Sequence, residues 1–201
     1  MTSRIREILV ESTDPAPLVT FWSELLQLPP LGDGAVRIDD GVRLRFAVTD
    51  EPKRVKNRLH LDLASTYSGH QAELVRSARA LGATTVDLGQ GDVPWVVLSD
   101  PGGNEFCVLE PRDEYQGIGA IAAVVFDACD PSALARFWSG PTGLPVTREH
   151  PVYASLRQDS RFWVEFIRVD EPKTVRNRLH LVVDGHQLPE RDPEGNEIVH
   201  T

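Results

Sequence analysis

A fourteen-residue segment that occurs twice constrains the fold of this chain more than any other feature. Residues 50–63 read DEPKRVKNRLHLDL and residues 170–183 read DEPKTVRNRLHLVV, so ten of the fourteen positions are identical. Upstream, an Asp-Pro pair and a Phe-Trp-Ser triplet also return, at Asp14, Phe21, Asp130 and Phe137. The chain is therefore an internal duplication, built from two copies of one unit.

The two copies cover residues 1–112 and 117–201, and the second copy is shorter. The turn at residues 100–105 (DPGGNE) returns at residues 192–197 (DPEGNE), 92 positions later, whereas the fourteen-residue segment returns 120 positions later. The second copy thus lacks 28 residues near its end. We interpret residues 1–112 as a complete domain and residues 117–201 as a copy without one helix and its adjoining strands.

The composition limits the class of protein. Thirty acidic against 21 basic side chains give a formal net charge of −9, and no basic run is interleaved with aromatic residues, so nucleic acid is an improbable partner. The apolar runs are too short to cross a bilayer, which argues against a membrane partner. The two cysteines, Cys107 and Cys129, lie in different copies without CxxC spacing, as expected for the reducing cytoplasm.

Each copy is expected to begin with a strand and a helix. Asp14 and Asp130 are candidate N-caps, each followed by a proline at the first helical position. In the second copy the Gly140-Pro141 pair should end the helix early. A second helix of the first copy is predicted from the capping-box pattern Ser68-x-x-Gln71 and should end at Gly82. Strands are expected at 4–11, 35–39, 42–48, 58–64, 93–99 and 105–110.

This pattern resembles the vicinal oxygen chelate superfamily, the fold of glyoxalase I, bleomycin-resistance proteins and extradiol dioxygenases. The resemblance rests on the Phe-Trp helix, on the Asp-Pro-x-Gly-Asn-Glu turn, and on residues 51–63, which are similar to the bacterial glyoxalase-like domains. It implies an α+β fold of paired βαβββ modules whose sheets curl into a cup. It also implies a small-molecule ligand, a divalent metal in the enzymatic members, and a homodimer in many of them.

The alternation of side chains along a strand indicates which residues face the cup. Leu59, Leu61 and Leu63 share one face of their strand, so His60 and Asp62 should face the cup. Family spacing places Glu7 on the first strand and Cys107 on the last strand of the first copy. We expect residues 1–112 to form one complete cup, with the second copy packed beside it or closing it.

The candidate catalytic residues are Glu7 and His60. Candidate substrate-binding residues are Arg43, Arg45, Asp62, Trp95 and Cys107. We expect no bound metal, because Arg43 and Arg45 occupy the strand that should supply a ligand; if an ion is bound, its ligands would be Glu7, His60 and Cys107. The alternative is a structural role, in which the histidine is simply hydrogen-bonded and the arginines are solvated or paired.

Two functions remain open at this point. One is a lyase, isomerase or dioxygenase-like enzyme in which Glu7 or His60 moves a proton and an arginine steadies an anionic substrate. The other is a metal-free binding protein that sequesters a drug or metabolite, as bleomycin-resistance proteins do, with Trp95 or Trp163 as an aromatic wall. The shortened copy could also be a structural cap.

Overall fold

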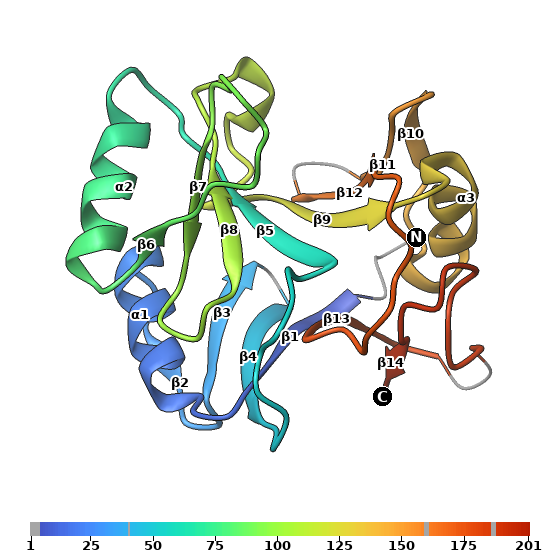
Figure 1. Ribbon diagram of the computed structural model, residues 1–201, viewed down its shortest axis with the longest axis horizontal. Helices are drawn as coiled ribbons and strands as arrows, with labels where there is room; N and C mark the ends of the chain where they lie inside the picture. Colours follow the sequence, from blue (N-terminus) through green and yellow to red (C-terminus); the bar gives the residue numbers. More distant parts are fainter. Residues whose placement is uncertain (1–4, 40, 159–160, 186–187) are drawn as a thin grey trace.

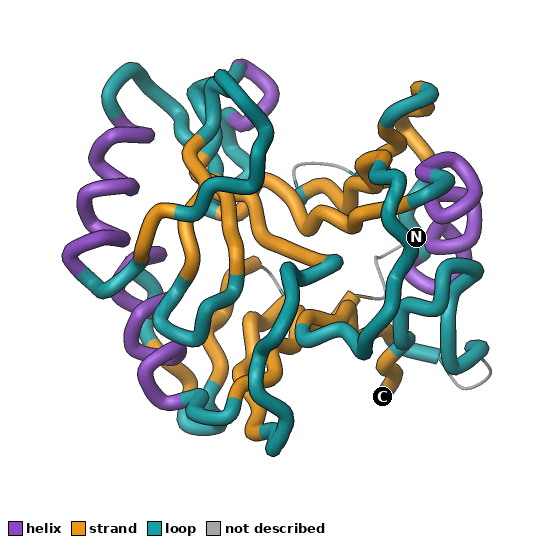
Figure 2. The backbone as a smooth tube through the Cα atoms, viewed as in Figure 1, coloured by secondary structure: helices purple, strands orange, loops and turns teal. Residues whose placement is uncertain are grey.

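The computed structural model describes residues 5–39, 41–158, 161–185 and 188–201. These residues form three α-helices, a short 3-10 helix and two β-sheets, with the α-helices at the outer flanks and the strands between them (Figure 2). The helices are α1 (Ala16–Leu26), α2 (His70–Ala80) and α3 (Pro131–Thr142), and the 3-10 helix is η1 (Asp113–Tyr115).

The strands follow a repeated order of one strand, one helix and three strands. The first module contains β1 (Ile5–Ser12), α1, β2 (Pro30–Leu31), β3 (Ala35–Asp39) and β4 (Val42–Val48). The second contains β5 (Leu59–Leu63), α2, β6 (Thr84–Thr85), β7 (Val96–Ser99) and β8 (Glu105–Val108), and the third contains β9 (Ile121–Ala128), α3, β10 (Val146–His150), β11 (Tyr153–Leu156) and β12 (Trp163–Arg168). The fourth is reduced to β13 (Leu179–Val183) and β14 (Val199–His200). The predicted α+β fold of paired βαβββ modules with a truncated second copy is confirmed.

The modules pair between the copies, and not within them. The eight-stranded sheet has the order β10-β11-β12-β9-β5-β8-β7-β6, so it joins the second module to the third through the antiparallel pair β5–β9. The six-stranded sheet, β14-β13-β1-β4-β3-β2, joins the first module to the fourth through β1–β13 (Figure 1). The expectation of one complete cup within residues 1–112 is therefore wrong.

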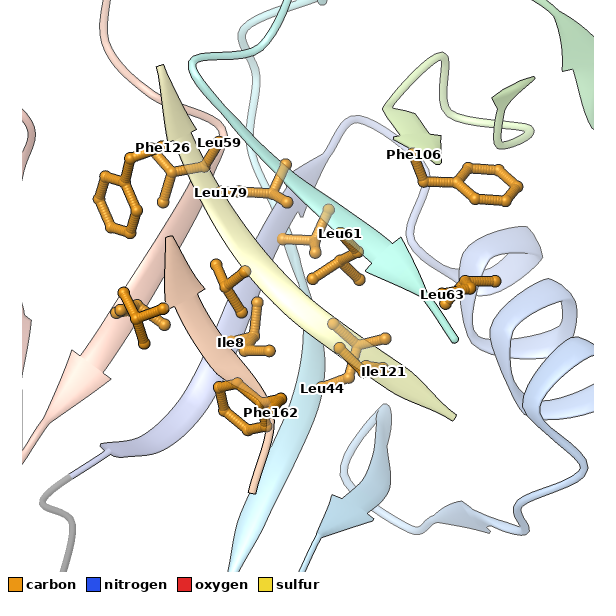
Figure 3. Close-up of a cluster of buried hydrophobic side chains, with 14 of the residues drawn as sticks. Ile8, Leu44, Leu59, Leu61, Leu63, Phe106, Ile121, Phe126, Phe162 and Leu179 are labelled. Carbon is orange, nitrogen blue, oxygen red and sulfur yellow. The ribbon is translucent and has the colours of Figure 1, made fainter. Parts of the chain in front are cut away.

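One continuous core lies between the two sheets. Leu59, Leu61 and Leu63 of β5 are at most 2% exposed and face the same interior as Ile8 of β1 and Leu44 of β4 (Figure 3). Each such side chain removed from water contributes about 1.5–3 kcal/mol. Because the leucine face of β5 is buried in this core, the opposite face of the eight-stranded sheet carries His60 and Asp62, as the alternation predicts.

The repeated motifs tie each copy together. The indole nitrogen of Trp22 donates to Asp100 Oδ2 at 3.1 Å, and Trp138 makes the equivalent bond to Asp192 at 2.9 Å. Thus the Phe-Trp helix and the Asp-Pro-x-Gly-Asn-Glu turn recur together because they contact each other. The aromatic pair belongs to the core.

Several local predictions differ from the structure. The first strand was expected from residue 4, which lies outside the described residues. Asp130 caps α3 by accepting from Ala133 N at 3.0 Å, but α1 has no side-chain cap, so the prediction for Asp14 is wrong. The capping box at Ser68 is also wrong, because Gln71 instead donates to the carbonyls of Pro94 and Val108.

Helix α3 does not end at Gly140-Pro141 but continues to Thr142. Pro141 lies in the last turn, where a missing N–H removes one helical hydrogen bond without stopping the chain. The helix ends instead at Gly143, whose φ of 70° is the left-handed conformation typical of a helix C-terminus.

Candidate functional site

A cavity of about 650 Å³ lies on the face of the eight-stranded sheet that is turned away from the core. We call it the cup cavity. One wall is apolar and comes from the second module and the loops around it: Leu88, Trp95, Val97 and Leu109. The floor is polar and is formed by β5, β8, β9 and β12. A volume of this size accommodates a small organic molecule.

Three polar side chains meet on the floor of the cup cavity. His60 and Asp62 project from the same face of β5, and His60 Nε2 lies 3.4 Å from Asp62 Oδ1. Cys107 joins them because the parallel register of β5 and β8 places it opposite Asp62. The three donor atoms lie within 4.8 Å of one another. Burial and the neighbouring charge of Asp62 raise the pKa of the Cys107 thiol well above its usual value.

The second copy contributes a carboxylate to the same floor. Glu165 of β12 pairs with Val125 of β9, and Val125 pairs with His60 of β5, so the three residues form one row across the sheet. Strand spacing separates Glu165 and His60 by roughly 10 Å, with only the short Val125 side chain between them. Burial, followed by the charge of Asp62, raises the pKa of Glu165 to about 7, although Ser155 Oγ lies 3.2 Å from one carboxylate oxygen.

The segment at the junction of the two copies, residues 112–116, closes one side of the cup cavity. Tyr115 of η1 is 4% exposed, and burial raises the pKa of its hydroxyl. The guanidinium of Arg112 lies 5.3 Å from the centre of the Tyr115 ring. Both residues line the cavity. Sequence reasoning missed them because this segment has no partner in the duplication and no periodic pattern.

Of the residues proposed from the sequence, His60, Asp62, Trp95 and Cys107 line the cup cavity. Trp95 belongs to its apolar wall and donates its indole N–H to Gln90 at 3.1 Å. Trp163 does not line it; the guanidinium groups of Arg148 and Arg157 lie 4.2 and 4.4 Å from the centre of its ring. Glu165, which also lines the cavity, was not among the site residues proposed from the sequence.

Glu7, Arg43 and Arg45 belong to the other sheet. Glu7 is 5% exposed on β1 and accepts hydrogen bonds from both arginines of β4. The predicted pair of Glu7 with His60, and the predicted metal set of Glu7, His60 and Cys107, are therefore wrong in their geometry. The physical reason is that β1 pairs with β13 and β5 pairs with β9, so the two strands belong to separate sheets.

The two histidines of the repeated segment have different surroundings. His180 is 1% exposed on β13, and neither ring nitrogen has a hydrogen-bond partner in the part of the chain that the structure describes. Its Nε2 lies 3.7 Å from Glu11 Oε2. Burial raises the pKa of Glu11, but His180 and Arg176 outweigh this and lower it to about 2. His180 is thus paired with a carboxylate in the six-stranded sheet, whereas the cup cavity lies on the eight-stranded sheet.

The donor set of the cup cavity fits a divalent metal ion. Asp62 Oδ1 is buried and has no hydrogen-bond partner among the described residues, so an acceptor is available where His60 and Cys107 also meet. Imidazole, carboxylate and thiolate together are the ligand types that zinc takes. The reason for expecting no metal no longer applies, because Arg43 and Arg45 do not lie near these side chains. Such an ion would polarise a ligand oxygen or acidify a bound water.

Two sheets of paired βαβββ modules, with a cavity on the open face of one of them, define the vicinal oxygen chelate class of proteins. The chain belongs to the glyoxalase-like domain family, which it matches over residues 7–109 and 123–192. A comparison with curated proteins found no match.

Solved structures show the same fold. Glyoxalase I from Zea mays is 12% identical, with a TM-score of 0.68 over 99% of this chain and 92% of that chain. A putative dioxygenase from Bacillus subtilis is 11% identical, with a TM-score of 0.58 over 96% of this chain and 72% of that chain. Identities this low establish the fold alone. Among the described residues, no helix is long and apolar enough to cross a membrane.

Proposed function

We propose that the chain binds a small organic molecule in the cup cavity and moves a proton on it with Glu165 and His60. The observation that carries this proposal is the row Glu165, Val125, His60, which places a carboxylate and an imidazole on the same cavity floor from two different copies. A carboxyl group with a pKa of about 7 both accepts and releases protons at neutral pH.

The lining of the cup cavity favours a molecule with an apolar or aromatic body and a polar end. Trp95 and its apolar neighbours form one wall. The polar part of the lining carries cations and carboxylates together: Lys56, Arg58, Arg112 and Arg168, with Asp62, Glu105, Asp127, Glu165 and Glu171. In the proposed reaction, Glu165 takes a proton from a carbon beside a carbonyl group, the electron pair moves to the carbonyl oxygen, and His60 donates a proton to that oxygen to give the enol. The reverse steps return a proton to the carbon. This is an isomerase type of step, since no group leaves the molecule.

Deuterium exchange tests the proposal directly. Phenylpyruvate has an aromatic ring, a carboxylate and acidic hydrogens next to a carbonyl, so NMR in D2O can follow exchange at that carbon above the spontaneous rate. We expect the wild-type protein to accelerate exchange. Both Glu165→Gln and His60→Ala should lose most of this acceleration, about 10²-fold or more, as is typical for the loss of a general base. Glu149→Gln, which changes an exposed glutamate on β10, is the matched control. Equal rates in Glu165→Gln and wild type would contradict the role of Glu165.

Sequestration without turnover is the second candidate function, and the apolar wall around Trp95 favours it. Under this alternative, phenylpyruvate binds with one molecule per chain and its exchange rate stays at the spontaneous value. Calorimetric titration beside the NMR measurement separates the two functions. Replacing Trp95 with alanine should weaken binding in either case.

A further inference from the structure

The two copies of the repeated segment meet where the chain crosses between the sheets. Residues 51–58 connect β4 to β5, and residues 171–178 connect β12 to β13. Arg58 Nη1 donates to the carbonyl of Glu171 at 2.6 Å, and Arg178 Nη1 donates to the carbonyl of Glu51 at 2.6 Å. Each loop therefore holds the start of the other through the same residue of the repeat.

A second cavity, of about 390 Å³, lies between these loops, and we call it the interloop cavity. Its lining carries six of the 21 lysines and arginines of the chain but only one carboxylate, that of Glu51. The six cationic residues are Lys53, Arg54, Lys56, Arg58, Arg176 and Arg178. In a chain with a net charge of −9, this is a local concentration of positive charge.

Carboxylates outside the interloop cavity hold several of these cations in place. Lys53 pairs with Glu105 at 2.7 Å, and Lys56 pairs with Asp127. Both carboxylates line the cup cavity instead of the interloop cavity. Arg176 pairs with Glu11, and Arg58 lies 3.5 Å from Glu194. Four of the six cations therefore have a carboxylate partner, and among the described residues Arg54 and Arg178 have none.

Hydrogen-bond donors remain unused in this lining. Lys53 Nζ donates to Glu105 and to the carbonyl of Val55, and Lys56 Nζ donates to Asp127 and to the carbonyl of Asn57. Each ammonium group has three donors, so one remains on each lysine. Within the described ranges, Arg54 makes no ion pair or side-chain hydrogen bond, and all five of its donors are available.

We propose that the interloop cavity binds a small phosphate-bearing molecule. Phosphate oxygens are strong acceptors, and converging guanidinium and ammonium donors are the groups that bind them. The volume lies at the small end of ligand pockets, enough for a phosphate group with a short organic part or a second phosphate. The counterpart of Arg54 in the second loop is Thr174, which lines the cup cavity. Only the first copy therefore has a cation at this position of the repeat.

Calorimetric titration of the full chain with pyrophosphate at low ionic strength tests the proposal. We expect one pyrophosphate per chain, with an affinity that falls as salt is added. Arg54→Glu should weaken binding about tenfold or more, since it replaces a cation with an anion at the cavity. Arg54 is exposed, so this variant should fold normally.

Two further variants show where the anion binds. Arg76→Glu makes the same charge change at an exposed position of α2 and should bind pyrophosphate like the wild type. His60→Ala, which alters the cup cavity, should also keep this binding, so the result does not depend on the function proposed for that cavity. The proposal is overturned if millimolar pyrophosphate gives no heat of binding, if Arg76→Glu weakens it as much as Arg54→Glu, or if His60→Ala abolishes it.

Discussion

Replacing Glu165 with glutamine should make the stability of the protein less dependent on pH. The ordinary pKa of this carboxyl group is 4.5, and burial together with the charge of Asp62 raises it to about 7 in the folded protein. Between these two values the folded chain binds more protons than the unfolded chain, so the free energy of unfolding falls as the pH rises. The difference between the two pKa values corresponds to a loss of up to about 3 kcal/mol in the free energy of unfolding above pH 7.

Glutamine keeps the shape of the side chain but does not ionise, so Glu165→Gln lacks this contribution. The free energy of unfolding of the variant minus that of wild type should rise by up to about 3 kcal/mol from about pH 5 to about pH 8. Urea denaturation at both pH values measures this difference. Glu149→Gln, at an exposed glutamate that pairs with Arg136, is the control and should show no such gain. A difference between Glu165→Gln and wild type that stays constant across this range would refute the reasoning.

Three further outcomes are expected. Added Zn²⁺ should bind at one ion per chain and release a proton from the Cys107 thiol. Isothermal titration should show that His60→Ala weakens this binding, and unchanged binding would exclude the cup cavity as the site. When expressed separately, the fragments 1–112 and 117–201 should each be unfolded or aggregated, and they should fold when mixed, as measured by circular dichroism and gel filtration. A cooperative melt of either fragment alone would contradict this. Because His180 lies in the six-stranded sheet, His180→Ala should lower the melting temperature but leave ligand binding in the cup cavity intact; loss of that binding in calorimetry would show otherwise.

The local structure could largely be predicted from the sequence. The strands expected at 35–39 and 42–48 have those bounds in the structure, and the leucines of β5 are buried on one face as the alternation indicates. These features depend on neighbouring residues, so a short stretch of sequence contains the necessary information. The family resemblance also follows from local motifs and is confirmed.

The pairing of the modules could not be predicted in this way. Both copies carry the Asn-Arg-Leu-His-Leu strand, so β1 meets the same side chains whether it pairs with β5 or with β13. Only contacts distant in sequence decide between these partners. As a consequence, the sequence places Glu7 beside His60, and the structure places Glu165 across from His60 instead. The assignment of catalytic, binding and metal-ligating roles to these side chains remains a prediction.

The pairing of β1 with β13 also sets the order in which the chain can fold during its synthesis. Ile5 and Val183 are partners, so β1 lacks one neighbour until residue 183 has left the ribosome. The eight-stranded sheet can close earlier, once β9 and the strands after it have been made. Contacts this distant in sequence form slowly, and an open strand edge attracts other chains in the meantime. Nascent chains that stall before β13 should therefore be the species most in need of a chaperone.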